Sequence, residues 1–175
     1  MELHGEVFLF NLSLIAVTFT AVTALVMLLR QTMGGKLSNF DIYLTTSFIS
    51  FGFAISLVAV IPPMLSLFEI TPRAIWGVSS GVAALVFAGV IATNIHRRRV
   101  VDKAPMSVAV VTSFSLQVFG VILQLINSFA QPWHGIDLFA AALTLSLAVI
   151  MWAFVRRIAS LVGDKPGDDW DPKRG

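Results

Sequence analysis

The sequence predicts an all-α integral membrane protein, built as a bundle of five transmembrane helices with the N-terminus outside and the C-terminus in the cytoplasm. Apolar residues make up 57% of the chain and charged residues only 13%, whereas about a quarter of a soluble domain is charged. The apolar residues are gathered in long stretches, and Lys and Arg flank these stretches unevenly. Most of the chain therefore has lipid as its solvent.

Each predicted helix rests on a stretch without ionisable side chains. A helix needs roughly 20 residues to cross about 30 Å of hydrocarbon, and four stretches reach this length easily. The fifth is charge-free only over 138–155, so Ile136 and the aliphatic parts of the flanking arginines extend it. Pro62 and Pro63 remove two amide donors, so we expect the second helix to end near Ile61. The predicted spans are 7–29, 42–61, 74–95, 106–130 and 136–155.

The orientation follows from the basic residues. Every Lys and Arg except Arg73 lies in the loop after span one, in the loop after span three or after span five. Basic loops stay in the cytoplasm, and an odd number of spans then places the N-terminus outside. We expect a multi-pass protein of the plasma membrane, or of the inner membrane in a bacterium. Residues 1–162 form the bundle, and the Gly-, Pro- and Asp-rich segment 163–175 forms a polar, mobile cytoplasmic tail.

Span four carries polar and small residues on one face. They recur at intervals of four and three, which is the spacing of neighbours along a helix surface. Amide side chains in hydrocarbon cost free energy unless they are hydrogen-bonded, so this face must meet another helix, a partner subunit or water. We call it the polar stripe; it consists of Ser113, Gln117, Gly120, Gln124 and Asn127.

Span three carries a row of small residues that begins with a Gly-x-x-x-Gly motif. Such rows let helix backbones approach closely, either within one chain or between copies. We call it the small-residue stripe; it consists of Gly77, Gly81, Ala84, Ala88 and Ala92. A shorter row in span one is a candidate packing partner within the bundle: Ser13, Ala16, Thr20 and Thr23.

The loop after span three is the candidate lipid-headgroup site. Arg97, Arg98, Arg99 and Lys103 lie within seven residues of each other. A basic side chain close to an anionic leaflet contributes about 1 kcal/mol to headgroup binding, although the same residues also serve as a topological anchor. At the start of span two, Ser38 and Asp41 have the spacing of a capping box.

The sequence lacks the side chains that several classes of protein function require. The chain has no Cys, which excludes disulfides and thiolate metal sites. We expect no ionisable residue at membrane depth, which argues against proton-coupled transport. We find no phosphate loop, paired intramembrane carboxylates or Ser/His arrangement, and therefore predict no enzyme, no cofactor and no nucleic-acid partner. We also predict no metal site; the residues closest to one are His4, Glu6, His134 and Asp137, whose chemistry suits zinc.

Three functions are compatible with these features. The leading hypothesis is a non-catalytic membrane component that acts through helix packing, as a homo-oligomer or as an accessory subunit of a larger assembly in the lipid bilayer. The second is a small homo-oligomeric channel whose neutral pore is lined by the polar stripe. The third is a metal-responsive membrane sensor that uses the outer histidines and carboxylates.

Overall fold

The computed structural model describes residues 5–32, 39–68, 70–101, 108–130 and 135–163. This part of the chain is all-helical, and each helix is long and apolar enough to cross a membrane. The predicted all-α architecture of five membrane-length helices is therefore confirmed. The helices are α1 (Glu6–Thr32), α2 (Asn39–Ser66), α3 (Pro72–Val101), α4 (Val108–Phe129) and α5 (Gly135–Gly163).

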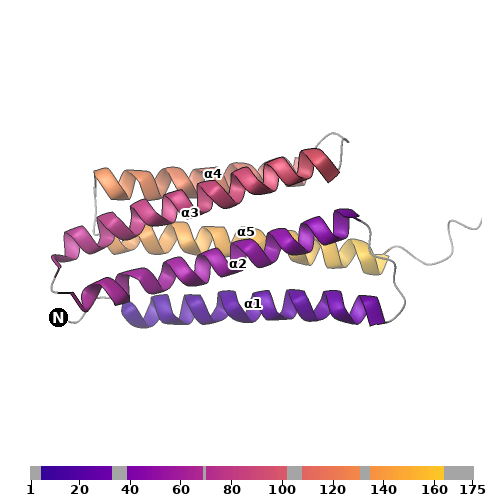
Figure 1. Ribbon diagram of the computed structural model, residues 1–175, viewed down its shortest axis with the longest axis horizontal. Coiled ribbons are helices and arrows are strands. Elements are labelled where there is room, and N and C mark those ends of the chain that lie inside the picture. Colours follow the sequence, from indigo (N-terminus) through magenta and orange to yellow (C-terminus); the bar gives the residue numbers. More distant parts are fainter. Residues whose placement is uncertain (1–4, 33–38, 69, 102–107, 131–134, 164–175) are drawn as a thin grey trace, which may run out of the picture.

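The helices run up and down side by side, as Figure 1 shows. The helices α2, α3, α4 and α5 form a four-helix unit in which α4 packs against both α3 and α5, while α1 lies at the margin against α2. We call the end at which α1, α3 and α5 finish the basic end. Every arginine of the described residues except Arg73 lies there: Arg30, Arg97, Arg98, Arg99, Arg156 and Arg157.

The helices are longer than the predicted spans. Arginine is a good helix former, so α3 and α5 continue through their arginines beyond the apolar stretch. The expectation that the second helix ends near Ile61 is wrong, because α2 continues through Pro62 and Pro63 to Ser66. Only one turn follows the prolines, and the Ser66 hydroxyl donates to the Pro63 carbonyl at 2.7 Å, which satisfies an acceptor in that turn.

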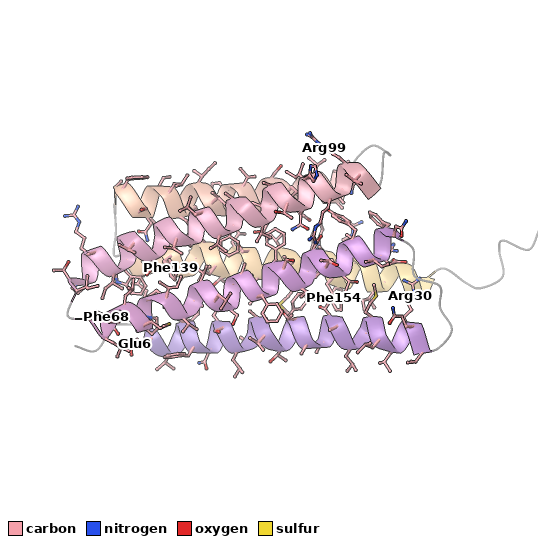
Figure 2. The ribbon with its side chains drawn as sticks, viewed as in Figure 1. Glu6, Arg30, Phe68, Arg99, Phe139 and Phe154 are labelled. Carbon is pink, nitrogen blue, oxygen red and sulfur yellow. The ribbon has the colours of Figure 1, made fainter. Side chains whose placement is uncertain are left out.

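Three aromatic rings join α1, α2 and α5 near the basic end. The ring of Phe154 lies edge-on to Phe19 at 5.3 Å and to Phe48 at 5.8 Å between centroids. Figure 2 shows Phe154 inside the bundle, between α1 and the other helices. Edge-to-face pairs contribute about 0.5–1.5 kcal/mol beyond the area that they bury. They help to hold α1 on the four-helix unit.

The helices α1 and α2 approach each other closely at Gly52. A Cβ atom at this position would lie 2.1 Å from Thr20 Oγ1 and 3.3 Å from the Ala16 carbonyl oxygen. The Thr20 hydroxyl is itself fixed, because it donates to the Ala16 carbonyl at 2.8 Å. The row predicted in span one is buried throughout and forms this contact surface on α1. Only a residue without a side chain fits opposite it.

Replacing Gly52 by leucine is expected to separate α1 from α2. Overpacking of a tight interface costs about 1–3 kcal/mol, so the Gly52→Leu variant should unfold at a clearly lower temperature in detergent, measured by size-exclusion chromatography after heating. Gly89→Leu is the matched control, because a Cβ at Gly89 would meet nothing within 4 Å. Equal loss of stability in the two variants would contradict the proposed role of Gly52.

Candidate functional site

A half-open cavity of about 250 Å³ lies between the helices of the four-helix unit near the basic end. Within the described helices, α2 and α4 make no close backbone approach, so side chains alone fill the space between them. The cavity is bordered by 40–51 of α2, 109–117 of α4 and 149–157 of α5. These stretches correspond to a depth of about 12 Å along α4 and α5. The volume would hold about eight water-sized groups.

The walls of this cavity are mostly apolar. Phenylalanine and tryptophan rings make up much of the surface, with aliphatic side chains of α5 between them. Gln117 is the polar residue deepest along α4, and it is almost fully buried. The site therefore suits an apolar chain better than a polar solute. The aromatic residues that line it are Phe40, Tyr43, Phe48, Phe51, Phe114 and Trp152.

Three arginines border the cavity at the basic end. Arg98 comes from α3, and Arg156 and Arg157 come from α5. The guanidinium carbons of Arg98 and Arg157 lie 5.9 Å and 5.6 Å from the centre of the Phe40 ring. Arg156 is held in the same way, 5.2 Å from the Trp152 ring. Cation–π contacts thus position three positive charges at the margin of an apolar cavity.

The predicted headgroup cluster divides into two directions. Arg98 is only 4% exposed and borders the cavity, whereas Arg97 and Arg99 are exposed. Figure 2 shows Arg99 pointing away from the bundle. Successive residues of a helix are about 100° apart, so three consecutive arginines cannot share one face. Lys103, the fourth member of the predicted cluster, lies outside the described residues.

An ion-pair network adjoins this arginine group. Asp41 is 6% exposed, and its Oδ2 atom lies 3.1 Å from Nη1 of Arg30. Its Oδ1 atom accepts a hydrogen bond from Nη2 of Arg157. One carboxylate thereby joins the end of α1, the start of α2 and α5 (Figure 2 labels Arg30). Ser38, the other member of the predicted capping box, lies outside the described residues.

Sequence reasoning missed this network and the two arginines that α5 contributes to the cavity. Arg156 and Arg157 were interpreted only as orientation signals, and Asp41 only as a helix cap. A signal was present, because Asp41 is the one carboxylate at the basic end in the part of the chain that the structure describes. A lone acid among many bases, at the end of an apolar stretch, favours a buried ion pair.

The polar stripe of α4 faces α5 and α3. Gln117 Nε2 donates to the Ser146 carbonyl at 3.1 Å, and Gln124 Nε2 donates to the Phe139 carbonyl at 3.3 Å. A Cβ at Gly120 would lie 3.4 Å from Ser146 Oγ, so this glycine also belongs to the contact. The side-chain amides of Gln117 and Gln124 therefore donate to backbone carbonyls of α5 in the same chain.

The two ends of the stripe differ. Asn127 is fully buried, and its Nδ2 donates to Ser80 Oγ at 2.8 Å and to the Gly135 carbonyl at 2.7 Å, which joins α4 to α3 and α5. Ser113 is half-buried, borders the cavity and donates to the Ala109 carbonyl of its own helix at 2.9 Å. Among the described residues of the polar stripe, those in the middle and at the end of α4 contact neighbouring helices, whereas Ser113 bonds within its own helix.

The small-residue stripe of α3 is also divided. Ser128 Oγ of α4 donates to the Gly77 carbonyl at 3.0 Å, and a Cβ at Gly81 would lie 3.1 Å from the same hydroxyl oxygen. This half, which includes the buried Ala84, packs inside the chain. Ala88 and Ala92 are exposed, and in a membrane they would face lipid or another helix.

The candidate metal residues are only partly described. His4 and His134 lie outside the described residues, and Asp137 lies in the first turn of α5. Glu6 lies at the start of α1, and its Oε1 atom is 3.3 Å from Ser66 Oγ at the end of α2. Among the residues whose placement is described, no three His, Cys, Asp or Glu side chains are grouped so that they could hold a metal ion.

Comparisons with protein-family models, with curated proteins and with solved structures find no significant match to this chain. Function is therefore inferred from the chemistry of its own residues.

Removing the Asn127 amide is expected to weaken the bundle. Interhelical hydrogen bonds in membranes contribute about 0.6–2 kcal/mol each, and Asn127→Leu removes two of them. The variant should show a lower unfolding midpoint in mixed detergent micelles, followed by circular dichroism. Ser115→Leu is the control, because Ser115 is exposed on the same helix. A midpoint for Asn127→Leu at or above that of the control would show that the amide does not stabilise the fold.

Proposed function

We propose that the protein is a non-catalytic, multi-pass membrane protein that binds an amphiphile with an anionic headgroup and an apolar chain in the cavity at the basic end. The observation that supports this most strongly is the placement of Arg98, Arg156 and Arg157 at the margin of a cavity with apolar, aromatic walls. A neutral apolar ligand would not need these charges, and a small anion would not need the walls.

The two parts of the site have different energetic roles. An apolar chain that moves from lipid into the cavity gains little, because lipid tails are as apolar as the walls. The headgroup therefore decides which molecule binds. Guanidinium groups bind phosphate and carboxylate oxygens through two parallel N–H donors, and these charge-assisted hydrogen bonds are among the stronger ones.

The orientation proposed from the sequence suits this function. The excess of Arg at the basic end favours a cytoplasmic location for that end, and the plasma membrane is the proposed membrane. The inner leaflet carries a negative surface potential from anionic lipids, so it would supply ligands of the required charge next to the cavity.

Binding is tested with dodecyl phosphate, titrated into the full chain in phosphatidylcholine nanodiscs and followed by calorimetry. Hydrogen bonds to charged groups contribute about 1.5–3 kcal/mol, so Arg98→Gln and Arg156→Gln should each weaken binding about tenfold or more. The matched controls, Arg97→Gln and Arg99→Gln, remove the same charge from exposed positions of α3. They should change the affinity less than twofold. Equal losses in all four variants would show nonspecific attraction, and no binding to the wild type would refute the proposal.

The orientation is tested by cysteine labelling, since the natural chain has no Cys. Thr71→Cys lies just before α3, opposite the basic end, and Thr32→Cys lies at the end of α1; both positions are exposed. A membrane-impermeant maleimide should label Thr71→Cys on intact cells, and Thr32→Cys only after permeabilisation. The reverse pattern would place the basic end outside.

A further inference from the structure

We propose that the cavity takes its ligand from the surrounding bilayer, through a lateral opening between the basic-end parts of α4 and α5, and that the ligand is an anionic membrane lipid. This inference rests on the proposed function and names the ligand class and the entry route of the same site. Trp152 and Arg156 form the border of this opening on α5.

The exposure of the residues around the cavity indicates where it opens. Of all the residues that border it, only Trp152 and Arg156 are exposed, and both belong to α5. The bordering residues of α4 nearest the basic end, Ala109, Val110 and Ser113, are half-buried, whereas most of those on α2 are buried. The cavity therefore opens at α5 rather than at α2.

The opening lies on the side of α5 that faces α4. Trp152 and Phe154 are about 200° apart around the helix, since successive residues are about 100° apart. Phe154 contacts Phe19 of α1 and Phe48 of α2, so the side of Trp152 is turned away from those two helices. The other helix that lines the cavity with several residues is α4, which packs along α5. The opening is thus between α4 and α5.

The opening lies at a depth where a membrane protein contacts lipid. Trp152 belongs to the charge-free part of α5, and Arg156 lies one turn closer to the basic end. Their exposed neighbours Met151 and Val155 are apolar, and so is Val108 at the start of α4. Tryptophan followed by arginine is typical of the boundary between hydrocarbon and headgroups. In a membrane, lipid is therefore the medium in front of the opening.

The hydrogen bonds between α4 and α5 leave this part of the interface able to separate. Gln117, Gln124 and Asn127 of α4 donate to backbone carbonyls of α5. Ser113, one turn nearer the basic end than Gln117, donates instead to the Ala109 carbonyl of its own helix. The first two turns of α4 can therefore move away from α5 without the loss of any of these three interhelical bonds.

A lipid of the bilayer fits this route. Its chain can pass from the hydrocarbon into the cavity without contact with water, while its headgroup stays near the surface and reaches the arginines from the side. The cavity holds only about eight water-sized groups, so the rest of a long chain would remain in the opening or in lipid. A neutral lipid could follow the same route, but it would lack the charge-assisted hydrogen bonds that the arginines offer to an anion.

A cross-link across the opening tests the route. Val108→Cys and Ala159→Cys place thiols at exposed positions of α4 and α5 at the basic end, in a chain without natural Cys. A flexible bismaleimide joins them in the full chain in phosphatidylcholine nanodiscs. Ile126→Cys with Ala141→Cys is the matched control, because each of these exposed positions lies 18 residues, or five turns, from its counterpart and so shares its helix face.

The probe is dodecyl phosphate with a terminal bromine, which quenches tryptophan fluorescence on contact, and binding is followed by stopped-flow mixing. The part of the signal that Trp152→Phe removes is assigned to the cavity, because Trp152 borders it. The bridge between positions 108 and 159 should slow association and dissociation about tenfold, a rise of about 1.4 kcal/mol in the barrier. The affinity should change less than about twofold, since a barrier on the path alters both rates equally.

Unchanged rates after the bridge at the basic end, or an equal slowing by the control bridge, would overturn lateral entry and leave the binding function intact. Failure of the probe to bind the chain before cross-linking would instead refute the proposed function.

The ligand class is measured separately in vesicles, without a cross-link. Dibrominated phosphatidic acid should quench Trp152 more strongly than dibrominated phosphatidylcholine at the same mole fraction. Arg98→Gln should remove most of this difference, because Arg98 is 4% exposed and cannot attract lipid to the outer surface. Arg97→Gln, at an exposed position of the same helix, should leave the difference unchanged. Equal quenching by the two lipids, while dodecyl phosphate still binds, would show that the ligand is not a bilayer lipid.

Discussion

The whole structure depends on the free energy required to hold a charged or hydrogen-bonding group away from water. Backbone amides meet this requirement by forming helices, so each long apolar stretch of the chain is helical. Polar side chains meet it only in part by turning inward, because the amide oxygens of Gln117, Gln124 and Asn127 are buried without a hydrogen-bond partner among the described residues. Gln117, Gln124 and Asn127 are buried more completely than the apolar residues beside them on α4, and each donates to a group on a neighbouring helix.

The same constraint shapes the basic end. Asp41 is buried there because Arg30 and Arg157 supply a positive charge to each of its oxygens. Arg98 is buried beside the Phe40 ring, which gives its planar guanidinium an electrostatic partner in place of water. A cavity next to such a group is an unusual environment, since fixed charges meet an apolar surface inside the bundle. The proposed ligand combines the two properties in the same way.

The helices could be predicted from the sequence because length and apolar composition act locally. The inward face of α4 was also predictable, since polar residues at helical spacing share one helix face, and in a membrane that face avoids lipid by packing against other helices. The end of α2 was predicted wrongly at Ile61. A proline removes a donor to the carbonyl four residues earlier, but the helix continues for one turn beyond the two prolines. In that turn the Ser66 hydroxyl donates to the Pro63 carbonyl, an acceptor at the end of the helix.

The candidate site was recognised only in part, and the case of three consecutive arginines shows why. Their identity suggested an affinity for anionic headgroups, yet Arg98 differs from Arg97 and Arg99 solely in the helix face that it occupies. That face borders a cavity only because α2, α4 and α5 place aromatic rings around it.

Composition and order of the residues were thus sufficient to predict the number of membrane-length helices and the concentration of positive charge at one end. The reason is that the composition of each segment by itself decides whether the segment lies in lipid or in water. The pairing of Asp41 with arginines from α1 and α5, and the cavity beside them, arise only when distant helices pack. These contacts join residues as far apart in sequence as Asp41 and Arg157, and no local pattern encodes such a distance.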